Sequence, residues 1–304
     1  MVNNHLASLT LPVATLITLM LCLLVGTSAV AHPGSGIVVS KKGEIFFTDT
    51  GRGVWKIDTL GKLTYVPASQ YHWMAIDESG YFAKSQKNFG NWFERIKPQG
   101  SKPQLILCSD FPITVNRDGN LYYADTRTGS PRLVRRTPEG KESVIAADVM
   151  FQGVSGIAAG PDGSLYVTDA SHPNANAIRR ITTDGNISMI ATDFVIVDSV
   201  KNPPPDTPPG LCRGLDVDSA GVVYVAATGC RRVVKIAPRA GAKVILESPE
   251  PWSPTGVTVF RGEVYVLEYR DAPPSQTEVR KAWIPRVRKI ARDGTITTLA
   301  TVSR

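Results

Sequence analysis

Six residues in this chain have side chains that could hold a charged or hydrogen-bonding ligand: His72, Trp73, Arg213, Glu268, Tyr269 and Arg270. An arginine presents a planar fork of donors that matches a carboxylate or a phosphate, and histidine with glutamate can act as acid and base. The residue types therefore indicate binding of an anionic group, with proton transfer as a second possible chemistry.

The elements that position these residues come from a unit of about 40 residues that recurs six times, a period typical of propeller blades. The clearest copy runs from Gly156 to Ala191 and begins GIAAGPDGSLYVTDA. Its aromatic and β-branched segments have the length of strands, and its Asp-Gly pairs mark hairpin turns. No segment outside residues 1–31 has helical periodicity. Each repeat is therefore predicted to form four short antiparallel strands.

Six units that cannot bury their faces alone predict one closed array, an all-β six-bladed β-propeller of four-stranded antiparallel blades. The repeats begin with an inner strand and end with an outer one, so we expect the first and last blades to close the ring by face packing. We expect the blades at residues 36–69, 73–109, 112–148, 156–193, 214–250 and 256–304.

Residues 1–31 contain no Lys, Arg, Asp or Glu, and the apolar run from Leu11 to Val25 is followed by small residues that end Ala29-Val30-Ala31. This pattern predicts a signal peptide, cleaved to leave a single domain of residues 32–304 that is secreted or periplasmic. The alternative is an uncleaved membrane anchor, because Leu11 to Ala31 is long enough to span a bilayer.

Three cysteines remain after such a cleavage. Cys212 precedes the first strand of the fifth repeat and Cys230 follows its second strand, so the hairpin between them brings both to the same end. An exported protein meets oxidising conditions, and we therefore predict a Cys212–Cys230 disulfide. Cys108 lies in the apolar segment LILC and is expected to be a buried thiol.

The net charge of +7 does not indicate a nucleic-acid partner. A basic residue recurs at one place in the third strand of each repeat, so the charge is spread around a ring and forms no single patch. We expect a monomer with a solvated basic rim. The six rim positions are Lys56, Arg95, Arg135, Arg180, Lys235 and Lys289.

Carboxylates also recur at the ends of second strands, at Asp49, Asp125 and Asp169. Because they occupy one place per blade, we expect them to cap the following turn rather than to form a site.

The start of each inner strand lies at one mouth of the predicted ring, where the insertions Val197–Gly210 and Glu268–Arg286 also emerge. Long loops at one mouth of a rigid ring are typical of a ligand site. The six residues that start the inner strands are Ser35, His72, Phe111, Ser155, Arg213 and Thr255.

The pattern GI-x-x-x-x-DG-x-[IL]-[YF]-V-[TA]-D, followed by a basic residue with Ile and then DG, resembles NHL repeats. The chain from Ser35 to Ser303 resembles the NHL and gluconolactonase/regucalcin group of six-bladed propellers. That resemblance implies a divalent metal held at the mouth by Glu, Asn and Asp. The matching positions here are Ser35, Ser155 and Arg213, so we expect no metal and no cofactor.

A histidine-ligated zinc lyase on a related propeller is a second enzyme that the resemblance suggests. Its chemistry needs several imidazoles in the channel. Residues 32–304 contain only His32, His72 and His172.

The sequence thus favours a propeller that binds an anionic small molecule, a saccharide or a peptide end at Arg213. Two alternatives stay open: a divergent lactone hydrolase or lyase that uses Arg213, His72 and Glu268 or a relocated metal, and a protein-interaction scaffold. Each of these residues also has a structural alternative to ligand binding. Arg213 could form an ion pair with a loop carboxylate such as Asp206, and His72 and Trp73 could serve the packing of the blade.

Overall fold

A computed structural model of the chain describes residues 33–50, 52–80, 93–108, 111–125, 131–147, 153–169, 177–192, 194, 204, 207–208, 210–270 and 283–303. The predicted signal peptide and most of both long insertions lie outside these residues. Pro33–Arg304 forms one compact unit. Within the described ranges, no helix has the length and apolar character that a membrane span requires.

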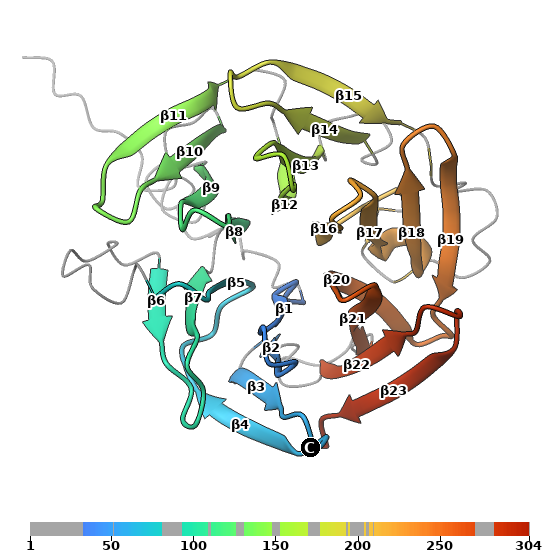
Figure 1. The fold of residues 1–304 in the computed structure, drawn as a ribbon. Coiled ribbons are helices and arrows are strands. Elements are labelled where there is room, and N and C mark those ends of the chain that lie inside the picture. The colour runs from blue at the N-terminus through green and yellow to red at the C-terminus, as the bar shows by residue number, and fades with distance from the viewer. Residues whose placement is uncertain are drawn as a thin grey trace, which may run out of the picture. The chain divides into compact units, whose positions relative to one another are not determined.

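The described strands form six sheets (Figure 1). The first three blades contain β1 (Ile37–Val39), β2 (Ile45–Asp49), β3 (Gly53–Ile57) and β4 (Leu63–Pro67); β5 (Trp73–Asp77), β6 (Phe93–Ile96) and β7 (Gln104–Cys108); and β8 (Ile113–Val115), β9 (Leu121–Asp125), β10 (Arg132–Arg136) and β11 (Glu142–Ala147).

The last three blades contain β12 (Val154–Ala159), β13 (Leu165–Asp169), β14 (Ala177–Ile181) and β15 (Ile187–Ala191); β16 (Leu215–Val217), β17 (Val223–Ala227), β18 (Arg232–Ala237) and β19 (Gly241–Glu247); and β20 (Trp252–Phe260), β21 (Glu263–Arg270), β22 (Ile284–Ile290) and β23 (Ile296–Thr301). A 3-10 turn, η2 (Thr228–Cys230), joins β17 to β18.

The inner strands pack against one another in the cyclic order β1, β5, β8, β12, β16, β20, and β20 returns to β1. Figure 1 shows this closed ring, with the first blade beside the last. The six-bladed propeller predicted from the repeats is therefore confirmed, and the ring closes between complete blades.

The second blade differs from the predicted strand order. Its described strands lie in the order β5-β7-β6, so β7 occupies the place next to the inner strand. The segment QLILC of β7 has four consecutive buried residues, whereas FERI of β6 is half-buried throughout. A position enclosed by neighbouring blades favours the more apolar segment.

The hydrophobic core is distributed between the blades rather than gathered at the centre. The second strands β2, β9, β13 and β17 are buried at every residue because each has a neighbouring blade on both faces. Between the second and third blades, the rings of Phe93, Phe111 and Tyr123 lie within 5.5 Å of one another between centroids. Such aromatic contacts add to the stabilisation from buried area.

The basic residue of the third strand lies opposite an aromatic residue of the second strand in five blades. The cross-strand pairs are Phe46 and Lys56, Tyr122 and Arg135, Tyr166 and Arg180, Tyr224 and Lys235, and Tyr265 and Lys289. In the fifth blade the Lys235 ammonium lies 5.8 Å from the centre of the Tyr224 ring. The repeated basic position is thus part of the internal construction of the blades.

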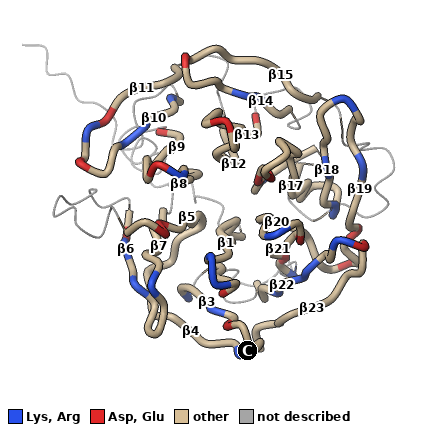
Figure 2. The backbone as a smooth tube through the Cα atoms, viewed as in Figure 1, with Lys and Arg blue, Asp and Glu red and all other residues tan. Residues whose placement is uncertain are grey.

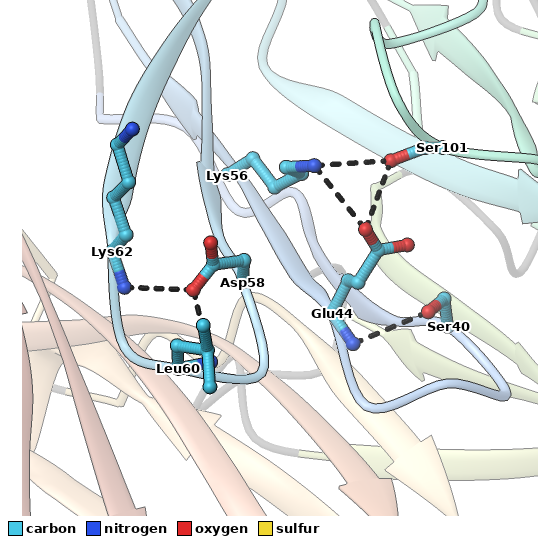
Figure 3. A network of polar contacts seen from close by, with 7 residues as sticks. All are labelled: Ser40, Glu44, Lys56, Asp58, Leu60, Lys62 and Ser101. Atoms are coloured by element: carbon cyan, nitrogen blue, oxygen red, sulfur yellow. Dashed lines mark hydrogen bonds and ion pairs between the residues drawn. The ribbon is translucent and has the colours of Figure 1, made fainter.

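Several of these cations are paired with carboxylates, which the sequence analysis did not predict. Lys56 Nζ lies 3.2 Å from Glu44 Oε1, and Ser101 of the second blade donates to the same carboxylate (Figure 3). Lys289 pairs with Glu263 at 2.9 Å. Figure 2 shows basic positions on every side of the ring, with acidic positions among them.

The carboxylates at the ends of the second strands accept from side chains of the third strand. Asp49 Oδ2 accepts from the indole of Trp55 at 3.0 Å, and Asp169 Oδ2 pairs with Arg179 at 2.6 Å. From the sequence we predict that these carboxylates cap the following turn. The structure shows that they have side-chain partners in the third strand.

The glycine that opens the first strand of most repeats is required by the approach of the next blade. A Cβ on Gly156 would lie 2.3 Å from the carbonyl oxygen of Arg213, and a Cβ on Gly256 would lie 2.3 Å from that of Ser35. Non-bonded atoms do not approach so closely, so only glycine lets the neighbouring backbones meet at this distance.

We expect Gly256→Ala to lower the free energy of unfolding by about 3 kcal/mol or more, because the added carbon displaces the first blade from the last. The matched control is Gly221→Ala, at a turn where φ is 77° and no atom lies within 4 Å of the new carbon. The control should lose only about 1–2 kcal/mol from the left-handed backbone. Equal losses in urea unfolding would contradict the close-approach account.

Side chains of the last blade also tie it to the first. Tyr269 Oη donates to the carbonyl of Thr48 at 2.6 Å and accepts from the backbone N–H of Thr50 at 3.1 Å. Thr255 Oγ1 donates to the carbonyl of Gly34 at 2.7 Å. Burial raises the pKa of Tyr269 to about 12, so its hydroxyl keeps its proton, and its donor role, at neutral pH.

Removing the closing hydroxyl should weaken the ring. Tyr269→Phe leaves a buried donor and a buried acceptor without their tyrosine partner, which costs about 1–3 kcal/mol of unfolding free energy. Tyr65→Phe removes an exposed hydroxyl that donates to Arg52, and it should cost less than about 0.5 kcal/mol. Thermal unfolding of the two variants side by side tests the difference, and a smaller loss for Tyr269→Phe would refute it.

Candidate functional site

The six residues that start the inner strands form a ring of blade junctions, which we call the mouth ring: Ser35, His72, Phe111, Ser155, Arg213 and Thr255. The N–H of Ser35 donates to the carbonyl of His72 at 2.7 Å, which joins the first two blades. Ser155 Oγ donates to the carbonyl of Cys212 at 2.5 Å, and the N–H of Gly214 donates to the carbonyl of Thr255 at 3.0 Å. These bonds fix the backbone positions from which the side chains project.

Exposure separates the six members of the mouth ring. Thr255, Phe111 and Ser35 are 0, 1 and 6% exposed, so their side chains belong to the packed junctions. His72, Ser155 and Arg213 are half-buried and can contact a solute. The hydroxyl of Ser155 is also within 2.9 Å of the Thr168 hydroxyl. His72 and Arg213 are therefore the functional groups that the mouth ring offers most directly.

Arg213 projects from a well-anchored backbone. Its N–H donates to the carbonyl of Ala226 at 2.9 Å, and its carbonyl accepts from the Thr168 hydroxyl at 3.3 Å. Burial lowers the pKa of the Arg213 guanidinium to about 10, so the group is still a cation at neutral pH, though a poorly hydrated one. A poorly hydrated cation gains more from an anionic partner than an exposed one does.

His72 approaches from the other side of the ring, because the second and fifth blades of a six-bladed propeller face each other. Its N–H donates to the carbonyl of Cys108 at 3.1 Å. Its imidazole meets the indole of Trp73 edge to face, with 5.9 Å between ring centres. Trp73 itself packs against the core cluster of the second and third blades, which is the packing role left open by the sequence.

Glu268 lies inside the sixth blade and is 0% exposed. Its carboxylate pairs with Arg286 Nε at 2.5 Å, accepts from Ser248 and lies 3.8 Å from Arg288. Arg286 in turn stacks over the ring of Trp252 at 3.9 Å. These contacts give the carboxylate a framework role within the blade.

Tyr269 and Arg270, the two residues after Glu268, have different surroundings. Tyr269 is 1% exposed, and its hydroxyl lies at the closing junction described above, whereas Arg270 is exposed at the end of β21. A role in ligand binding remains a prediction for these residues. The insertion that follows them, beginning at residue 271, lies outside the described residues.

The mouth ring does not supply the ligands of a hard divalent cation. The relevant positions hold two hydroxyls and a guanidinium, and the Ser155 hydroxyl already donates to a carbonyl. Over the part of the chain that the structure describes, no three His, Cys, Asp or Glu residues gather as a metal site. Of the three histidines considered above, His32 and His172 lie outside that part.

The two cysteines of the fifth blade lie in one buried cluster. The N–H of Gly229, next to Cys230, donates to the carbonyl of Leu211, next to Cys212, at 3.0 Å. In the structure both side chains are thiols. Burial raises the pKa of both, to about 11 for Cys230, so neither is primed as a nucleophile.

The central channel contains a carboxylate that the sequence analysis overlooked. A cavity of about 190 Å³ is enclosed by all six inner strands, and Asp216 is among its lining residues. The signal was available in the repeat alignment. Three residues after the start of the inner strand, where the fifth repeat has Asp216, the other repeats have Val38, Ala75, Thr114, Ala158 and Thr258.

A larger hollow of about 640 Å³ lies between the fourth and fifth blades. Its charged lining residues include Asp162 and Arg180, which pair with each other at 2.5 Å. Its apolar lining includes Met189 and Ile190 of the outer strand β15. Because this hollow is lined by strands far from the mouth ring and its ion pair is internally satisfied, we place the candidate site at the mouth.

No protein-family model matches this chain, and no curated protein matches it. Solved structures do match. A luciferin-regenerating enzyme is 15% identical over 88% of this chain and 92% of its own, with a TM-score of 0.56. A putative gluconolactonase is 16% identical over 88% and 90%, with a TM-score of 0.54.

Virginiamycin B lyase from Staphylococcus aureus is 16% identical over 88% of this chain and 83% of its own, with a TM-score of 0.50. The chain is thus similar in fold to gluconolactonase-like and lyase propellers, which confirms the resemblance seen in the repeats. Identities this low show the fold alone.

Proposed function

We propose that this protein is a secreted or periplasmic propeller that binds an anionic small molecule, a saccharide acid or a peptide carboxylate at the mouth ring. The observation that carries the proposal is the half-buried side chain of Arg213, held by an anchored backbone where the inner strands begin. The export part of the proposal rests on the pattern of residues 1–31.

Two features of the mouth ring support an anionic ligand. Arg213 offers paired donors that match a carboxylate, in surroundings dry enough to strengthen the contact. His72 starts the inner strand on the opposite side of the ring and adds a second hydrogen-bonding side chain to the mouth. The buried hydroxyl and aromatic members of the ring give this arrangement a rigid base, so little ordering is required on binding.

The fold neighbours favour an enzyme of the lactone hydrolase or lyase type as the second candidate. In that reading His72 transfers a proton and Arg213 stabilises the developing negative charge. The partner expected for His72, Glu268, is bonded to Arg286 and Ser248 within the sixth blade. We therefore rank binding above turnover, and a protein-interaction scaffold third.

The function is tested by a thermal-shift screen of lactones, sugar acids and short peptides against the protein and its Arg213→Met variant. We expect anionic compounds to stabilise the protein and to lose that effect in the variant. The shift that each compound causes is measured against the melting temperature of the same variant without ligand. The matched control is Arg52→Met, at an exposed turn residue.

Three results would change the interpretation. Undiminished stabilisation of Arg213→Met by anions would remove Arg213 from the site. A large loss of stability in Arg213→Met would assign the residue to the framework. Product formation from any lactone in the screen would favour the enzyme.

We also propose that Cys212 and Cys230 form a disulfide in the exported protein. Closing the loop of about 19 residues would stabilise the fold by about 3 kcal/mol. Peptide mass analysis of protein exported by the cell and alkylated before reduction should recover the two cysteines as one linked pair, with Cys108 alkylated. Alkylation of all three cysteines would contradict the disulfide.

A further inference from the structure

The hollow between the fourth and fifth blades is a second place where the chain can take up a ligand. Its volume of about 640 Å³ is that of a pocket for a drug-sized molecule, and its lining is mainly apolar. The fourth blade contributes Met189, Ile190 and Ala191 of β15, and the fifth blade contributes Ile236 of β18 and Ala242 of β19. Figure 1 shows these two blades side by side. No member of the mouth ring lines the hollow.

The apolar lining continues the hydrophobic core between the two blades. Tyr166, Val223 and Ile236 line the hollow and are also buried members of the core cluster that joins the fourth blade to the fifth. Met189 and Ile190, by contrast, are 42 and 39% exposed. The interface between the blades therefore opens to solvent here, and an apolar solute in the hollow would remove these side chains from water.

The charged residues of the lining leave one positive charge unmatched. Asp162 and Arg180 pair with each other at 2.5 Å, and the hydroxyl of Ser164 donates to the same carboxylate at 3.1 Å. Arg239 is exposed, and among the described residues its side chain has no hydrogen-bond or ion-pair partner. The hollow thus combines apolar walls with a single free guanidinium.

Arg239 also has a backbone conformation that favours glycine. It follows Pro238 in the turn between β18 and β19, where the N–H of Ala240 donates to the carbonyl of Ala237 at 3.2 Å, and its φ is 68°. A positive φ at the third residue of such a turn favours glycine or asparagine. The backbone of this turn therefore does not explain why an arginine is present.

Two other arginines with positive φ have structural partners. Arg231 donates to the carbonyl of Trp252 at 2.9 Å, and the guanidinium of Arg261 lies 4.8 Å from the centre of the Phe260 ring. These contacts account for the arginine in each place. No contact among the described residues does so for Arg239, and a strained residue of this kind points to a partner outside the protein.

We propose that the hollow is a second binding site, for an amphipathic monoanion whose aliphatic chain lies against Met189 and Ile236 and whose carboxylate pairs with Arg239. The stem of an arginine covers apolar surface while its guanidinium stays at the water boundary, which is where the head group of such a ligand lies. A cationic amphiphile would be repelled by the guanidinium, and a sugar acid would gain nothing from the apolar walls. The ligand is thus of the fatty-acid class, and the site is separate from the proposed function at Arg213.

The test is isothermal titration of the full chain, purified after removal of any signal peptide, with octanoate, 1-octanol and octylamine below the concentrations at which they aggregate. We expect octanoate to bind about tenfold or more tightly than either analogue, because only octanoate makes the charge-assisted contact. From hexanoate to octanoate to decanoate, binding should tighten about threefold to fourfold for each added methylene.

Two substitutions separate the contributions of charge and wall. Arg239→Gly removes the guanidinium from a backbone conformation that suits glycine, so the variant should fold at least as well and bind octanoate no more tightly than octanol. Met189→Asp places a like charge on the wall and should weaken octanoate binding about tenfold or more. Its matched control is Val244→Asp, because Val244 has the same register position on β19, is 39% exposed and does not line the hollow.

The Arg213→Met variant distinguishes this inference from the proposed function. We expect it to bind octanoate as the unchanged protein does. Loss of octanoate binding in Arg213→Met, with full binding in Arg239→Gly, would place the ligand at the mouth and overturn the inference while supporting the proposed function.

Three further results would also overturn the second site. They are octanoate binding no tighter than that of octanol or octylamine, equal effects of Met189→Asp and Val244→Asp, and binding of none of the three probes. The proposed function does not depend on these results, because it is judged by sugar acids and short peptides.

Discussion

The whole structure depends on the close approach of six backbones around one axis. At several starts of inner strands, the following blade comes so close that the preceding blade has room only for a glycine, as between Gly156 and Arg213 and between Gly256 and Ser35. Hydrogen bonds across the same junctions hold the blades in register. The mouth ring is therefore both the tightest part of the framework and the place where side chains meet solvent, and this makes it a rigid base for a ligand.

Much of the fold was predictable because each repeat contains its own turn glycines and strand-length apolar segments. The clearest prediction, SLYVTDA, became the buried strand β13. The order of the second blade was not predictable, because the local pattern does not say which apolar strand will lie next to the inner one. The ion pairs between carboxylates and cations were not predictable either. Lys56, for example, contacts both Glu44 and Ser101 only because the first two blades pack against each other.

The sequence predicted the place of a candidate site residue only where that residue has a fixed position within the repeat. His72 and Arg213 are at the mouth because they start inner strands, which the repeat alignment shows directly. Tyr269 meets Thr50 across 219 residues of sequence, and no local pattern indicates that contact. Asp216 was overlooked for another reason: a single aspartate in a strand resembles its turn-forming neighbour Asp218, and only the closed ring shows that it lines the channel.

We propose Arg213 as the anion-binding group of a rigid mouth, held by the backbone bonds of the blade junctions. The most direct test is a crystal structure of the protein grown with gluconate or a short peptide. The account predicts a carboxylate of the ligand on the guanidinium of Arg213, within the mouth ring. A ligand bound elsewhere, with Arg213 paired to a carboxylate of the protein, would contradict it.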